Sequence, residues 1–126
     1  MDDKGNLPSK EEIEQFLKIF KSCWDGSVVP RQDTRNEETL ADLCITPRHR
    51  LKEVRNLCAE DYYRGPSPDH DGDPGKEWWE FGRSIEGYEI YIKIRIYKKS
   101  NNQYAGKCMS FHIADKEITY PYKKEG

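Results

Sequence analysis

The sequence predicts an α+β fold in which N-terminal helices pack on one face of a small C-terminal antiparallel sheet. Two observations lead to this prediction. Apolar residues recur at helical spacing in the first half of the chain, and from Glu77 onward they alternate with polar residues. A stretch rich in turn-forming residues, Gly65–Gly75, divides the two halves. At 126 residues the chain suits a single domain, spanning 1–126, with one core.

The first helix is expected to begin at Ser9. Ser9 and Glu12 fit a capping box, in which each side chain satisfies a backbone N–H group of the first turn. The helix ends at Asp25–Gly26, and Val28–Pro30 follows as a short edge strand or an extended connector, because Pro30 has no N–H to donate. The expected apolar face of this helix consists of Ile13, Phe16, Leu17, Phe20 and Trp24.

Two shorter helices are expected next. One runs over Asn36–Cys44, and the other begins with Thr46 as its N-cap and Pro47 at its first position. The side chains expected to face the core are Leu40, Leu43, Cys44, Leu51, Val54, Leu57 and Cys58.

The second half is expected to contribute the sheet. Predicted turns lie at Glu86–Gly87 and Ser100–Asn102. The predicted strands are 77–83, 88–98, 107–113 and a last edge strand, 117–122, bounded by Pro121.

The strand 88–98 alternates most clearly, and its two faces differ in chemistry. Its isoleucines, together with Met109, Phe111 and Ile113, are expected to meet the helices, whereas Cys108 falls on the other side. The side chains expected on the open face are Tyr91, Lys93, Arg95, Tyr97, Ser110 and His112. Antiparallel pairing would bring cross-strand neighbours among them within about 5–8 Å of one another.

The open face has two interpretations. Lys93 and Arg95 could hold a phosphate, His112 could transfer a proton near neutral pH, and Tyr91 and Tyr97 could stack on bases or donate hydrogen bonds. The alternative is an ordinary solvated sheet face of mixed charge.

Charge is distributed unevenly along the chain. The net charge of −2 combines −6 over residues 1–82 with +4 over residues 83–126, where nine basic groups face five acidic ones. The positive half favours a partner that carries phosphate, but a pI near 5.9 argues against tight, sequence-independent binding of nucleic acid. The sequence shows no apolar run long enough for a signal peptide or a membrane span, so we expect a cytoplasmic protein.

No cofactor or metal site is predicted. The four cysteines form no C-x-x-C pair and are expected to be buried, reduced thiols. Asp69, Asp71, Asp73 and Glu80 match carboxylate positions of an EF-hand loop, but Pro74 stands where such a loop needs glycine. A solvated acidic turn is therefore the preferred interpretation.

Four short segments follow one another in a suggestive order. They are AEDYYRGP at 59–66, WWEFG at 78–82, EIYIKI at 89–94 and MSFH at 109–112. Together these segments resemble the MqsR-type toxins, a branch of the RelE-like ribonucleases from bacterial type II toxin–antitoxin pairs, over residues 38–113. The resemblance implies a RelE-like sheet and a metal-independent endoribonuclease, an mRNA interferase that cuts messenger RNA through the ribose 2′-hydroxyl.

The resemblance also implies roles for individual residues. Arg64, Glu80, Tyr91 and His112 take the places of catalytic residues, with Trp79 as the alternative to Glu80. His112 stands where the family has a lysine. Residues of the open face, Lys93, Arg95, Tyr97 and Ser110, are assigned to substrate binding.

The implied partners are messenger RNA and a cognate antitoxin, expected to be a DNA-binding helix-turn-helix protein that covers the basic sheet. The slightly acidic charge and the aspartate-rich loop depart from the family pattern. The acidic balance and the mixed charge of the sheet face favour an alternative function, a non-catalytic protein-binding module with the same fold.

Overall fold

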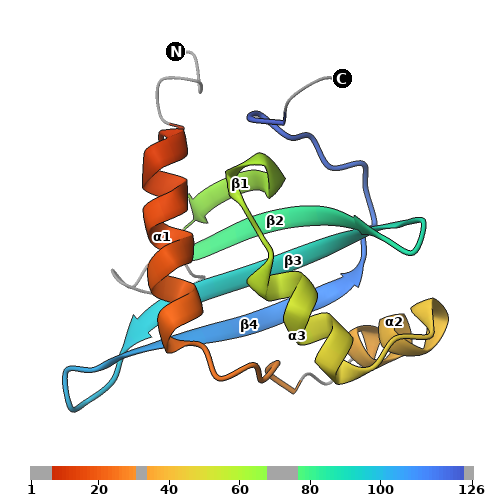
Figure 1. Ribbon diagram of the computed structural model, residues 1–126, viewed down its shortest axis with the longest axis horizontal. Coiled ribbons are helices and arrows are strands. Elements are labelled where there is room, and N and C mark those ends of the chain that lie inside the picture. The colour runs from red at the N-terminus through yellow and green to blue at the C-terminus, as the bar shows by residue number, and fades with distance from the viewer. Residues whose placement is uncertain (1–6, 31–33, 68–76, 124–126) are drawn as a thin grey trace.

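The computed structural model describes residues 7–30, 34–67 and 77–123. Three helices come first, α1 (Lys10–Cys23), α2 (Arg35–Leu43) and α3 (Pro47–Arg55), followed by a single 3₁₀ turn, η2 (Ala59–Asp61) (Figure 1). The strands are β1 (Tyr62–Ser67), β2 (Trp78–Ile85), β3 (Tyr88–Lys98) and β4 (Tyr104–Ile113). They form one antiparallel sheet in the order β1-β2-β3-β4. The predicted α+β layout is confirmed.

The helix starts follow the capping signals in the sequence. The Ser9 side chain accepts a hydrogen bond from the Glu12 N–H, and the Glu12 carboxylate accepts one from the Ser9 N–H, so the capping box is formed. At α3, Thr46 Oγ1 accepts from the His49 N–H at 3.1 Å, and Pro47 occupies the first helical position. Both predicted starts are confirmed.

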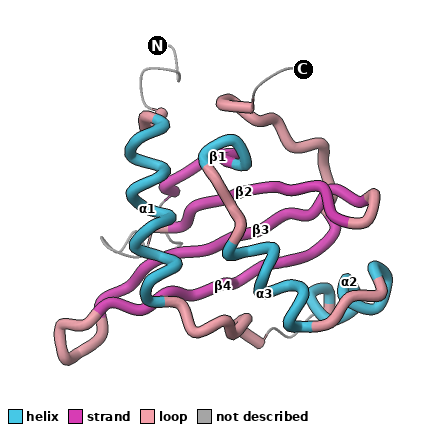
Figure 2. Tube along the Cα trace, in the orientation of Figure 1, coloured by secondary structure: helices cyan, strands magenta, loops and turns pink. Residues whose placement is uncertain are grey.

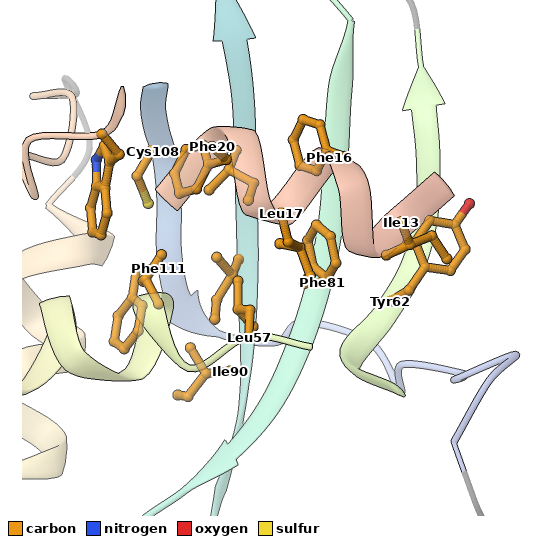
Figure 3. Close-up of a cluster of buried hydrophobic side chains, with 14 of the residues drawn as sticks. Ile13, Phe16, Leu17, Phe20, Leu57, Tyr62, Phe81, Ile90, Cys108 and Phe111 are labelled. Atoms are coloured by element: carbon orange, nitrogen blue, oxygen red, sulfur yellow. The ribbon is translucent and has the colours of Figure 1, made fainter. Parts of the chain in front are cut away.

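The core lies between α1 and the sheet (Figure 3). The Phe16 ring from α1 stacks on Trp79 from β2, with ring centroids 4.2 Å apart. Ile90, Ile92 and Phe111 are completely buried, as the alternation predicted. Burying side chains of this size stabilises the fold by about 1.5–3 kcal/mol each, so the helices are held chiefly by this apolar contact.

A β-bulge at Met109 changes the orientation of half of β4. Lys93 pairs with Ser110, but the next residue, Ile94, pairs with Cys108, so Met109 has no partner on β3. Because of this extra residue, Cys108 turns into the core and Met109 does not join it. The predicted orientations of Cys108 and Met109 were therefore wrong, since a bulge shifts the alternation by one residue.

Helix α2 covers the outer edge of β4. Asn36 Nδ2 donates to the Met109 carbonyl at 3.1 Å, and Asn36 Oδ1 accepts from the Phe111 N–H at 3.0 Å. Thr39 Oγ1 accepts from the Ile113 N–H at 3.2 Å. These side chains satisfy backbone groups that an edge strand would otherwise expose, so α2 is fixed against the sheet.

Three other expectations differ from the structure (Figure 2). The chain continues past Gly65 as strand β1, and 117–122 is not a strand. Cys44 and Cys58 are exposed rather than buried, because Cys44 ends α2 in a left-handed conformation and Cys58 precedes η2. Asp69, Asp71 and Asp73 of the acidic loop lie outside the described residues.

Candidate functional site

The sheet face opposite α1 carries the side chains that the alternation placed there. Tyr91 pairs with His112 and Lys93 with Ser110 across β3 and β4, and Glu80 of β2 pairs with Lys93. The Tyr91 and His112 rings lie side by side, with centroids 5.3 Å apart. The expected convergence of phenol, imidazole and cation on one face is confirmed.

Tyr91, Lys93, Ser110 and His112 form the floor of a hollow of about 280 Å³. Its walls come from elements far apart in the sequence. Arg35 begins α2, Tyr63 and Arg64 belong to β1, and residues 114–118 follow β4. The hollow is therefore assembled only when the helical and sheet halves are packed together.

A buried carboxylate holds two of the predicted catalytic side chains. Glu80 is only 5% exposed; its Oε1 accepts a hydrogen bond from Tyr91 Oη at 2.5 Å, and its Oε2 accepts one from Arg64 Nε at 3.0 Å. Burial, and then the hydrogen bond to Glu80, raises the pKa of Tyr91 far above its usual value. Tyr91 is thus a neutral phenol that keeps its proton.

His112 is 7% exposed, and its Nδ1 atom is close to two groups. The Ile113 carbonyl oxygen lies 2.9 Å away and Arg35 Nη2 lies 3.2 Å away. The carbonyl can only accept a hydrogen bond and the guanidinium can only donate one, so the two contacts need opposite roles of Nδ1, and the tautomer decides which of them is a hydrogen bond. In the tautomer that carries its proton on Nδ1, Nε2 is the nitrogen of His112 that accepts a proton.

Arg35 connects His112 to the segment that follows β4. Its Nη2 donates to Asp115 Oδ2 at 2.5 Å, and this hydrogen bond holds the pKa of the Asp115 carboxyl below its usual value. Arg35 is separated from His112 by 77 residues in the sequence. No local pattern signalled its role, and sequence reasoning missed it along with Tyr63, Asp115 and Lys116, which also line the hollow.

The remaining predicted residues separate into two groups. Lys93 and Ser110 line the hollow, whereas Arg95 and Tyr97 lie farther along β3 and do not. Of the two alternatives on β2, Trp79 is stacked in the core and Glu80 is on the side of the hollow. Glu80 does not line the hollow itself, so it acts on Tyr91 and Arg64 as a positioning residue.

Within residues 7–30, 34–67 and 77–123, no three His, Cys, Asp or Glu side chains are grouped so that they could hold a metal ion. No helix in the described parts of the chain has the length and apolarity needed to cross a bilayer. Comparisons with models of protein families, with curated proteins and with solved structures find no match for this chain.

Proposed function

We propose that this chain is a metal-independent endoribonuclease, the toxin of a bacterial toxin–antitoxin pair, that cuts messenger RNA. The observation that carries the proposal is the Tyr91–His112 pair at the floor of a hollow that four cationic side chains also line, namely Arg35, Arg64, Lys93 and Lys116. A proton acceptor beside phosphate-binding cations provides the base and the charge stabilisation that cleavage through the 2′-hydroxyl requires. The likeness of the four sequence segments to MqsR-type toxins supports the same activity.

The proposed reaction begins at the ribose 2′-hydroxyl. His112 Nε2 accepts its proton while the 2′-oxygen forms a bond to the adjacent phosphorus and the bond from phosphorus to the 5′-oxygen breaks. The leaving 5′-oxygen takes up a proton from solvent, and His112 gives its proton back to solvent. The Tyr91 phenol, whose own proton is donated to Glu80, stays neutral beside His112 and positions the strand. The products are a 2′,3′-cyclic phosphate and a 5′-hydroxyl.

The cations supply charge stabilisation in this scheme. Arg64 on β1 and Lys93 on β3 flank Glu80 from its two neighbouring strands, where they can bind the non-bridging phosphate oxygens as negative charge develops. Glu80, which lies under the lining of the hollow, orients Tyr91 and Arg64 through its two hydrogen bonds. We place this activity in the cytoplasm, with an antitoxin as the partner that covers the basic face.

A non-catalytic binding module is the second candidate. Glu80 and Asp115 each pair with an arginine of the hollow, so part of its positive charge is already neutralised. Because its positive and negative charges partly cancel, the hollow could also bind a protein surface that carries charges of both signs.

Cleavage of a short end-labelled RNA by the purified protein in the presence of EDTA separates the two candidates. We expect cyclic-phosphate ends, and we expect His112→Ala to slow cleavage by about 10²–10⁴-fold, the usual contribution of a general base. His49→Ala is the matched control, because His49 lies on α3 and pairs with Glu53 away from the hollow. A wild-type protein that leaves RNA intact, or cleavage that is equal in both variants, would contradict the nuclease proposal.

A further inference from the structure

Beyond the hollow, the same sheet face continues as a row of alternating cations and aromatic rings, which we call the cation–aromatic ladder. Lys93 Nζ lies 5.1 Å and Arg95 Cζ lies 4.7 Å from the centre of the Trp78 ring. The Tyr97 ring is then contacted by Arg95 at 5.7 Å and by Lys107 Nζ at 5.1 Å. The members of the ladder, in order along the face, are Lys93, Trp78, Arg95, Tyr97 and Lys107.

From the ladder we infer a second binding subsite, which takes the unpaired nucleotides that flank the cleaved phosphate of a single-stranded RNA. The inference rests on the proposed function in that RNA is the ligand of the hollow. Lys93 belongs to both the hollow and the ladder, so a strand whose phosphate lies at Tyr91 can continue along the ladder without leaving the face.

The ladder offers charge as well as ring surface. Among the described residues, Lys93, Arg95 and Lys107 form no ion pair with a carboxylate, and each lies over an aromatic ring. The Arg95 Nε atom is buried and has no hydrogen-bond partner in the part of the chain that the structure describes. Positive side chains interleaved with aromatic rings are what single-stranded nucleic acid requires, since the cations bind phosphates and the rings stack on bases.

The members differ in accessibility, which decides their roles. Trp78 and Arg95 are 6% and 9% exposed, so they support the row from beneath. Lys93, Tyr97 and Lys107 are half-buried and keep part of their side chains on the surface. We therefore assign base stacking to Tyr97 and phosphate contacts to Lys93 and Lys107.

At the end of the hollow away from the ladder, the sheet face is covered by the segment that follows β4. This cover bears on the side by which a bound strand leaves the hollow. A Cβ atom on Gly82, the cross-strand partner of Tyr91, would lie 2.6 Å from Tyr120 Oη and 2.7 Å from Ile118 Cδ1. Glu89 holds this segment by accepting hydrogen bonds from the Ile118 N–H at 3.2 Å and from Tyr120 Oη at 2.9 Å. The C-terminal segment thus occupies the face beyond Tyr91, and we place the exit of the strand on the side of the ladder.

Binding of a labelled, fully 2′-O-methylated single-stranded oligoribonucleotide tests the subsite without cleavage, because this probe lacks the attacking hydroxyl. We expect Tyr97→Ala to weaken binding about tenfold, as the loss of one stacked base does. We expect Lys107→Ala to reduce the slope of log affinity against log salt by about 0.7, the contribution of one phosphate contact on a single strand. A duplex of the same sequence should bind more weakly than the single strand, because its bases are not free to stack.

The chain provides matched controls on the same hairpin. Lys98 and Tyr104 pair with each other on β3 and β4, one residue away from Tyr97 and on the opposite face. Lys98→Ala and Tyr104→Ala should bind the probe as the wild type does. Equal binding by all four variants, or no binding by the wild type, would overturn the subsite.

The two proposals fail in different ways. Ladder-dependent binding by a protein that cleaves no RNA would overturn the nuclease and leave the subsite in place. Cleavage that is abolished by His112→Ala, with a strand affinity that Tyr97→Ala and Lys107→Ala do not alter, would overturn the subsite and leave the nuclease in place.

Discussion

At the scale of single residues, Glu80 determines the chemical state of its neighbours. It lies almost completely buried and uses one oxygen for Tyr91 and the other for Arg64. A buried carboxylate needs such partners, because an uncompensated charge away from water is costly. The result is a phenol held neutral next to a guanidinium held in place.

The substitution Glu80→Gln tests this arrangement directly. The neutral amide removes the charge and the strong acceptor that help to raise the pKa of Tyr91, so we expect that pKa to move down toward its usual value. It can be followed by NMR titration of the phenol carbon. For the proposed cleavage we also expect a lower kcat with a smaller change in KM, because Tyr91 would no longer be held in position beside His112 while the cations remain.

Glu89→Gln is the matched control for this experiment. Glu89 accepts a hydrogen bond from Tyr120 as Glu80 does from Tyr91, and the pKa of Tyr120 is raised by burial and by Glu89. The control should lower the pKa of Tyr120 and leave that of Tyr91 unchanged. If the pKa of Tyr91 is the same in Glu80→Gln as in the wild type, Glu80 does not contribute to raising that pKa.

At the scale of elements, helix α2 connects the helical half to the site. Asn36 makes two hydrogen bonds to the backbone of β4 at the bulge, and the preceding residue, Arg35, reaches His112. The helix therefore fixes the edge of the sheet and places one wall of the hollow at the same time.

Asn36→Ala should be destabilising. It leaves the Met109 carbonyl and the Phe111 N–H without partners in a buried place, which costs about 1–3 kcal/mol for each unsatisfied group. We expect the midpoint of urea unfolding to fall, with the slope m unchanged, while Glu37→Ala on the exposed side of α2 has little effect. A midpoint equal to that of the wild type would show that water satisfies the edge of β4 as well as Asn36 does.

The elements also show where reasoning from the sequence succeeds and where it fails. The capping residues at Ser9 and Thr46 and the alternation in 88–98 act locally, so they predicted two helix starts, strand β3 and its open face. The bulge at Met109 depends on pairing with β3 and on Asn36, which lies 73 residues away, and no local pattern encodes it. Strand β1 was missed because Gly65 and Pro66 are typical of a turn, and only pairing with β2 makes them part of a sheet.

At the scale of the whole molecule, the charge asymmetry of the chain becomes a difference between faces. Acidic and basic groups near α3 and η2 neutralise one another, since Arg83 pairs with Glu53 at 2.9 Å and with Asp61 at 2.9 Å. The cations of the ladder, on the opposite face, have no such carboxylate partners among the described residues. The net charge of −2 therefore hides a local positive surface, and total charge is a poor guide to what this face binds.

Alkaline pH should unfold the protein, because tyrosines hold several of its parts together in the neutral form. Tyr62 Oη donates to the Gly65 carbonyl, and burial raises the pKa of Tyr62 to about 12. Below the ordinary tyrosine pKa of about 10, the folded and unfolded chains both carry this proton; above it the unfolded chain loses the proton first. The free energy of unfolding should then fall by about 1.4 kcal/mol per pH unit for each such tyrosine, until the folded form also ionises.

Tyr62→Phe isolates one of these contributions. Above pH ~10, the free energy of unfolding should fall less steeply with pH for the variant than for the wild type. The two slopes should differ by about 1.4 kcal/mol per pH unit, the contribution of one tyrosine. Tyr104→Phe, at a side chain that is 59% exposed, should follow the wild-type curve. The free energy of unfolding of all three proteins can be measured by chemical denaturation at a series of alkaline pH values. Identical slopes for wild type and Tyr62→Phe would mean that the phenol of Tyr62 ionises as readily in the folded protein as in the unfolded chain, against the burial that the structure shows.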